Sequence, residues 1–195
     1  MSAPDSAHAA AAGIRLASLP ANIVELAALR SRSVDLGRLA AARGLALADF
    51  GHITAQSPGL TLSVRPRRWL LLTAAASGQG GATAWQEAAA GCGVAVDLSS
   101  ALAALVLSGP AVRDMLARSC RLDLAAEAFP DGRAAATIMV QVSVILAALG
   151  GAMLLLTPAT TARHVHEWLV TTSQPFGLAL APQLSPADLS GDNRV

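Results

Sequence analysis

The chain has 195 residues, of which 53% are hydrophobic and only 14% charged, and its formal net charge is +1. A composition this apolar excludes a disordered chain. A net charge this small argues against a protein that binds nucleic acid through attraction to its phosphates. All 14 basic residues are arginine and there is no tyrosine, which excludes enzymes that need a lysine Schiff base or a tyrosine acid.

Residues 1–20 are small and low in complexity, and we expect them to form a flexible leader. They lack the basic start and long apolar run of a signal peptide, so a cytoplasmic location is expected. The segment 182–195 is polar and rich in proline, which predicts a flexible tail. Between them, residues 21–181 are predicted to form one domain of two intimate halves, about 21–100 and 101–181.

The first half is predicted to hold strands, helices and one hairpin turn. Asn22 opens a strand or short helix at 23–29, and Ser33 is the expected N-cap of a helix that Gly44 ends. The remaining elements are strands at 60–64 and 69–73 around a turn at 65–68, a Gly-rich loop at 78–81, a helix at 82–90 and a strand at 93–98.

The second half repeats this order. A strand at 103–107 leads into a helix that begins at 108–110 and buries Val112, Met115 and Leu116. A loop or helical turn at 123–132 follows. The last predicted elements are strands at 135–140, 142–147 and 152–156, and a helix that Thr160 or Thr161 caps and that ends before Gly177.

Residues 134–162 carry no charge, which leaves a membrane helix as an alternative for this run. Three features favour strands instead. Gly150-Gly151 is typical of a two-residue hairpin turn, Gln141 and Ser143 stand two apart as on one face of a strand, and the run from Ile138 is rich in β-branched residues.

A short internal repeat predicts the fold class. Leu70-Leu71-Leu72-Thr73 recurs 84 residues later as Leu154-Leu155-Leu156-Thr157, and each copy precedes a helix that carries a tryptophan, Trp85 or Trp168. We therefore predict an α+β fold of two ferredoxin-like βαββαβ halves, with mostly antiparallel sheets and helices on one side of each.

The sequence carries few residues in patterns typical of a catalytic or metal-binding site. Cys92 and Cys120 are too few for a disulfide scaffold or a four-thiolate zinc site, and two free thiols are favoured over one bridge. His164 and His166 stand two apart, which places them on opposite sides of a helix, so the surface of an amphipathic helix is favoured over a metal site. No catalytic, cofactor-binding or metal-ligating residue is nominated.

Two polar segments keep alternatives open. Asp97-Leu98-Ser99-Ser100 is either an active-site strand end or a turn cap, and the absence of a nearby base favours the cap. The turn of Arg65, Arg67 and Arg68 is the only dense positive cluster, and it is either a solvated hairpin turn or a docking patch for an acidic partner. Arg121 and Phe129, in the loop after the third helix, are further candidates for a partner interface.

An ordered set of motifs resembles the γ subunit of heterotetrameric sarcosine oxidase. It covers roughly residues 20–180 and includes Pro66 with Trp69-Leu70-Leu71, and Asp97-Leu98-Ser99. The stretch from Leu105 to Gly177 carries Leu107-Ser108-Gly109-Pro110-Ala111-Val112-Arg113, Met115-Leu116, Cys120-Arg121-Leu122-Asp123-Leu124, Ala128-Phe129-Pro130, Thr137, Leu154-Leu155-Leu156 and Trp168-Leu169.

The resemblance implies a fold related to the glycine-cleavage T-protein and a non-catalytic accessory subunit. Its partners would be α, β and δ chains, with no nucleic acid and no membrane. Such a complex oxidatively demethylates sarcosine or a related N-methyl amine and passes the one-carbon unit to tetrahydrofolate. The resemblance places FAD, FMN, NAD, zinc and tetrahydrofolate on the other subunits, and no cofactor on this chain.

Two departures mark the chain as a divergent relative. The two acids of the family's hairpin turn are Arg67 and Arg68 here, and the histidine that follows the family's serine is Ser100. The alternative hypothesis is a free-standing, folate-binding enzyme of the T-protein type, in which Asp97 would be the acid that holds the pterin. A membrane-associated protein is a third, lower-ranked possibility.

Overall fold

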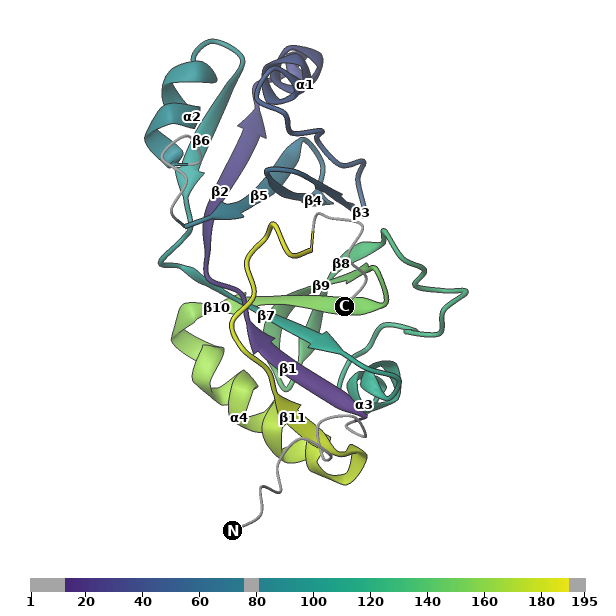
Figure 1. The fold of residues 1–195 in the computed structure, drawn as a ribbon. Helices are drawn as coiled ribbons and strands as arrows, with labels where there is room; N and C mark the ends of the chain where they lie inside the picture. The colour runs from purple at the N-terminus through teal and green to yellow at the C-terminus, as the bar shows by residue number, and fades with distance from the viewer. Residues whose placement is uncertain (1–12, 76–80, 190–195) are drawn as a thin grey trace.

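The first two strands of the chain lie in different sheets. The computed structural model describes residues 13–75 and 81–189. Within it, β1 (Ile14–Ser18) belongs to one sheet and β2 (Ala21–Ala28) to the other, and only Leu19 and Pro20 separate them. Figure 1 shows this purple segment running from the lower sheet into the upper one.

Each half has the predicted βαββαβ order with one extra strand after its first helix, so that the observed order is βαβββαβ. The first comprises α1 (Ser33–Ala41), β3 (His52–Gln56), β4 (Gly59–Arg65), β5 (Arg68–Ala74), α2 (Ala82–Ala88) and β6 (Gly93–Asp97), in addition to β2. The second comprises β7 (Leu102–Ser108), α3 (Val112–Ala117), β8 (Ala134–Met139), β9 (Val142–Leu149), β10 (Ala152–Pro158), α4 (Ala162–Ser173) and β11 (Leu178–Leu180), with short 3₁₀ turns at Ala159–Thr161 and Gln174–Phe176.

The strand orders confirm the predicted fold class. The N-terminal sheet runs β3-β4-β5-β2-β6 and is antiparallel throughout. The C-terminal sheet runs β11-β1-β7-β10-β9-β8, in which only β1 and β11 pair in parallel. When β3 is left out of the first sheet, and β8 and the inserted β1 out of the second, the remaining orders are β4-β5-β2-β6 and β9-β10-β7-β11. Both are the strand order of a ferredoxin-like half. The repeated Leu-Leu-Leu-Thr segments lie in β5 and β10, which are equivalent strands.

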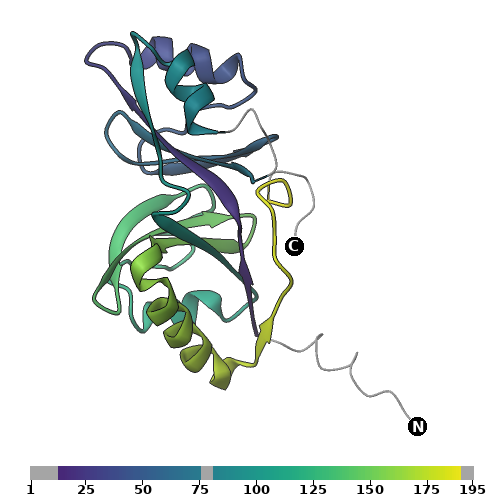
Figure 2. The ribbon, with the colours of Figure 1, turned by 90° about the vertical axis from the view of Figure 1, so that its left-hand side faces the viewer.

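The elements stack in four layers, helices–sheet–sheet–helices (Figures 1 and 2). Leu26, Leu36 and Trp85 are buried between the N-terminal sheet and its helices α1 and α2. Alternate residues such as Leu72 and Leu156 point the other way, into the core between the two sheets. A third core, which contains Met115, Leu155 and Leu169, lies between the C-terminal sheet and helices α3 and α4. Because successive side chains of a strand point to opposite faces, one continuous apolar run places apolar side chains on both faces of its sheet.

The uncharged run forms strands and not a membrane helix. Residues 134–158 make β8, β9 and β10, and Gly150 and Gly151, with φ of 58° and 81°, form the predicted two-residue turn. No helix in residues 13–75 or 81–189 is long and apolar enough to cross a membrane.

The structure corrects the expected chain ends. Residues 14–18 are not part of a loose leader, because they form β1, in which Ile14 is fully buried. Residues 182–189 are not free either, because the Leu184 N–H donates to the Ser18 carbonyl (2.9 Å) and Leu184 and Leu189 pack on the core between the sheets. The rest of the leader (1–12) and of the tail (190–195), and residues 78–80 of the Gly-rich loop, lie outside the described residues.

Two helix starts also differ from the expected ones. The helix expected to begin at 108–110 is α3, which begins at Val112 with Ala111 at the cap position. Ser33 is the first residue of α1, and Arg32 holds the cap position without a side-chain hydrogen bond. The predicted end is right: Gly44 follows the helix with φ of 76°, a conformation that glycine adopts at low cost.

Candidate functional site

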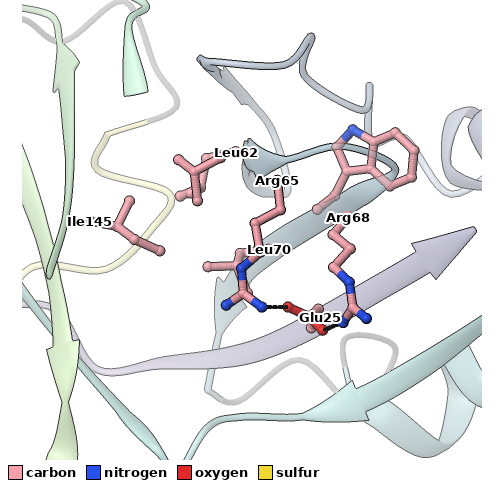
Figure 3. A pocket seen from close by; sticks show the side chains of 8 residues that line it. Glu25, Leu62, Arg65, Arg68, Leu70 and Ile145 are labelled. Atoms are coloured by element: carbon pink, nitrogen blue, oxygen red, sulfur yellow. Dashed lines mark hydrogen bonds and ion pairs between the residues drawn. The ribbon is translucent and has the colours of Figure 1, made fainter. Parts of the chain in front are cut away.

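The arginine turn is anchored by a buried carboxylate that the sequence analysis did not single out. Glu25 of β2 stands opposite Leu70 of β5, and Arg68 is its diagonal neighbour, two residues further along β5. The Arg68 Nη1 lies 2.5 Å from Glu25 Oε1, and the Arg65 Nη1 lies 3.9 Å from Glu25 Oε2 (Figure 3). Two of the three arginines of the turn therefore converge on one acid.

Burial makes this pairing necessary. The Glu25 side chain is only 12% exposed, on the sheet face that points toward the other half of the molecule. Leu62, Leu70 and Ile145 line the cavity beside it, whose volume of about 10 Å³ admits roughly one water molecule. A carboxylate so removed from solvent is costly to leave without a counter-charge. Arg68 supplies that charge, and Arg65, which is more exposed, adds to it.

Arg67 differs from its neighbours. It is the second residue of the two-residue turn between β4 and β5, with φ of 59°, and its carbonyl accepts a hydrogen bond from the Ala28 N–H (3.0 Å). A proline followed by a residue at positive φ is the pattern of a type II turn. The Arg67 side chain is exposed and makes no ion pair with any described residue. It is thus the arginine of the turn that is free to meet another molecule.

The other two predicted interface residues do not join this site. Phe129 is 4% exposed and lies in the core on the helix side of the C-terminal sheet, so its assignment to a partner interface is wrong. The loop that holds it is fixed by Arg113, whose Nη1 donates to the carbonyls of Leu124 (2.7 Å) and Phe129 (2.9 Å). Arg121 is exposed on the same loop, and no described interaction links it to the arginine turn.

Asp97 is a turn cap. Its carboxylate accepts a hydrogen bond from the Ser99 N–H (2.9 Å), while the Ser99 Oγ accepts one from the Ile23 N–H (3.0 Å). Hydrogen bonds from Ser99, the side-chain bond more than the backbone bond, hold the pKa of the Asp97 carboxyl below its usual range. Both groups therefore fix the link between β6 and β7.

His164 is exposed on α4 and His166 is partly exposed, which agrees with the expected amphipathic helix. Glu167 of the same helix pairs with Arg163 one turn earlier (2.8 Å), and this hydrogen bond lowers the pKa of the Glu167 carboxyl. The described residues hold no group of three or more His, Cys, Asp or Glu side chains placed to bind a metal ion. Cys92 and Cys120 are free thiols, which confirms the preferred prediction for them.

A larger hollow, of about 360 Å³, lies where the chain crosses between the two halves. Its walls come from the β1–β2 link and the start of β2, from Ser99, from residues 102–105 of β7 and from Ala75, and none of its lining residues is titratable. Its Ser99 hydroxyl is already engaged by Ile23. The hollow offers shape and apolar surface, but no acid or base.

Two solved structures place this fold among known proteins. No protein-family model matches the chain, and no curated protein matches it. A chain of heterotetrameric sarcosine oxidase from Corynebacterium sp. U-96, in complex with pyrrole 2-carboxylate, is 26% identical with a TM-score of 0.74, and the match covers 89% of this chain and 93% of that one.

The second is the glycine cleavage system aminomethyltransferase T from Bartonella henselae, with a TM-score of 0.63 and 15% identity. That match covers 87% of this chain but only 48% of the other, so the chain spans about half of the aminomethyltransferase. The predicted resemblance is therefore confirmed: the chain is similar to a chain of heterotetrameric sarcosine oxidase, and its fold is related to that of the glycine-cleavage T-protein.

Proposed function

We propose that this chain is a γ-type accessory subunit of a sarcosine-oxidase-like heterotetramer. One observation carries the proposal: the match to a sarcosine oxidase chain extends over nearly the whole of both chains. A similarity of this extent is expected between subunits with the same place in an assembly. In this proposal the partners are α, β and δ chains.

The chemistry takes place on those partners. The assembly oxidatively demethylates sarcosine or a related N-methyl amine and passes the one-carbon unit to tetrahydrofolate. FAD, FMN, NAD, zinc and the folate belong to the other subunits, and this chain supplies structure and contact surface.

The arrangement of its polar residues supports a non-catalytic role. Glu25 is held by Arg68, Asp97 is held by Ser99, and Glu167 is paired with Arg163 on an exposed helix face. Each of these acids has a structural task, and none of them lines the large hollow between the halves. A general acid or base must reach a bound substrate, which these groups do not.

The arginine turn also fits a divergent member of the family. The resemblance implies acids at the positions of Arg67 and Arg68. In this chain Arg68 has a counter-charge in Glu25, so the reversed charge at that position is balanced within the chain.

Purification of the assembly through an affinity tag on this chain, from its native host, tests the proposal. We expect a flavin-containing preparation with several chains in fixed proportion, and a colourless, inactive protein when this chain is produced alone. Flavin absorbance in a preparation of this chain by itself would contradict the proposal. Micromolar binding of tetrahydrofolate to the isolated chain would favour the free-standing enzyme instead.

A further inference from the structure

One face of the N-terminal sheet exposes a contiguous apolar patch. Val94 and Val96 of β6 point to the same side, because residues two apart in a strand share a face. The register places Val96 beside Glu25 and Val94 beside Ala27 of β2, and Leu29 continues that alternation just past the end of β2. Leu29, Val94 and Val96 are 45%, 46% and 45% exposed. We call Ala27, Leu29, Val94 and Val96 the valine face.

The valine face continues a surface that is buried elsewhere. Ile23 of β2 and Leu72 of β5 lie on the same side of this sheet, and the C-terminal sheet covers them. β2 leads away from that second sheet (Figure 1), so the residues toward the end of β2 have no strand facing them. Sheet faces of this composition are normally covered, and exposed apolar side chains gathered in one place mark sites of association.

Charge borders the patch on one side. Arg68 pairs across the ladder with Ala27, so the arginine turn lies directly beside the valine face. The turn contributes three arginines against the single carboxylate of Glu25, which Arg68 engages at 2.5 Å. Arg67, without an ion pair among the described residues, remains to meet carboxylates from outside, and Arg65, which is largely exposed although it lies 3.9 Å from Glu25, adds positive charge beside it.

We propose that the valine face and the arginine turn together dock a protein segment with apolar side chains at its centre and acidic residues at its border. The apolar centre does not suit a nucleic acid, whose backbone would place phosphates over it, and the positive border suits carboxylates. The surface is a property of this chain alone. The identity of the partner, one of the larger subunits of the assembly, rests on the function proposed above.

The double variant Val94→Asp/Val96→Asp tests the docking surface in the full chain, tagged and purified from its native host. A charged group at the centre of an interface is poorly tolerated and here would also repel an acidic partner. We expect the amount of partner that co-purifies with the variant to fall about tenfold or more below the amount that co-purifies with the wild-type chain. The control is Val34→Asp/Phe50→Asp, since these side chains are 66% and 62% exposed and lie outside the valine face; it should assemble normally.

A gentler variant protects the test against misfolding. Val94→Thr/Val96→Thr keeps the β-branched shape and strand preference but exchanges one methyl of each side chain for a hydroxyl. It should melt near the wild-type temperature and show a smaller loss of partner than the aspartate variant. Normal retention of partner by both valine variants would overturn the docking surface.

The outcomes separate this proposal from the proposed function. If wild-type and aspartate chains both retain a flavin-bearing partner equally, the surface is wrong and the function stands. If the wild-type chain retains a stoichiometric partner without flavin and the aspartate variant loses it, the surface stands and the function is wrong. A wild-type homodimer that the aspartate variant converts to monomers would assign the valine face to a second copy and overturn the proposal. A wild-type chain that purifies as a monomer with nothing bound would overturn both.

Discussion

Thr73 and Thr157 occupy the same position in the two halves of the molecule, and both bury a hydroxyl that makes no hydrogen bond with any described residue. They close the repeated Leu-Leu-Leu-Thr segments in β5 and β10 and point toward the helices of their own half. A buried hydroxyl without a partner lowers the stability of the fold. We expect Thr73→Val and Thr157→Val, which keep the side-chain shape, to be neutral or to stabilise the chain by about 1 kcal/mol each.

Urea unfolding of the two single variants and of the double variant measures this effect. The contributions should add, because the two positions lie in different cores. Clear destabilisation by either valine would mean that the hydroxyl has a partner, such as a bound water molecule.

The Glu25–Arg68 pair should stabilise the N-terminal sheet. Arg68→Gln leaves the buried Glu25 carboxylate with only the more distant Arg65, and we expect a loss of about 1–2 kcal/mol in the free energy of unfolding. The loss is modest because solvent reaches the Arg68 side chain and screens the pair. A double-mutant cycle with Glu25→Gln isolates the coupling between the two residues, and a coupling of zero would contradict the anchoring role of Glu25.

Arg67 and Arg68 should respond differently to reversal of charge. Arg67→Glu changes an exposed side chain without an internal ion pair, so it should weaken assembly and leave the melting temperature nearly unchanged. Arg68→Glu places a second acid beside Glu25 and should lower the melting temperature. Changing both together would confound docking with stability, because Arg68 pairs with Glu25 and Arg67 does not.

Size-exclusion chromatography and thermal melting of the two single variants separate these effects. Normal assembly of the Arg67→Glu chain would remove that side chain from the interface. Unchanged melting of the Arg68→Glu chain would instead show that Glu25 tolerates a nearby negative charge.

Ser99→Ala should raise the pKa of Asp97. Hydrogen bonds from Ser99 favour the ionised carboxylate, so the folded pKa lies below the unfolded one. The stabilisation from this cap is therefore present above the unfolded pKa and is lost as the pH falls through the folded pKa. An NMR titration of the Asp97 carboxyl carbon checks the shift, with Glu167 as an internal control that should not move.

The turn between β8 and β9 stores strain that can be removed. Val140 and Gln141 adopt φ of 49° and 63°, a left-handed conformation that is costly for a β-branched residue. The equivalent turn between β9 and β10 uses Gly150-Gly151. Val140→Asn/Gln141→Gly gives the first turn the residues that such hairpins prefer, and we expect about 1 kcal/mol of added stability in thermal or urea unfolding. Loss of stability would show that contacts of the half-buried Val140 side chain outweigh the strain.

Local patterns predicted the parts of the fold that depend on local interactions. The turn at Gly150-Gly151 and the hairpin at 65–68 follow from turn chemistry, and the buried Val112, Met115 and Leu116 follow from helical spacing. β1 was missed because its pairing with β7 joins residues about 90 positions apart, and no local pattern encodes such a pair. The same holds for the tail at 182–189, which packs on strands from the start of the chain.

The sequence predicted the arginines of the candidate site but not the carboxylate that they bind. The arginines of the turn were evident as a charge cluster, whereas Glu25 stands inside the strand segment Ile23-Val24-Glu25-Leu26 and was treated as part of its pattern. A lone acid at an inward-facing strand position is the signal that could have indicated a buried ion pair. Phe129 was placed on the surface because it lies in a loop, but that loop folds back onto the core through Arg113.

The position of β1 bears on how the chain is made. Its partners in the C-terminal sheet, β7 and β11, lie about 90 and 160 residues further along. During synthesis the N-terminal sheet has all of its strands once residue 97 has left the ribosome, but Ile14 and Leu16 must then wait for most of the remaining chain before their side chains can be buried. Contacts over such sequence distances form slowly, and unpaired apolar strands are prone to aggregate. The nascent chain is therefore most prone to aggregate at its N-terminal strand β1, during the interval in which the second sheet is still being translated.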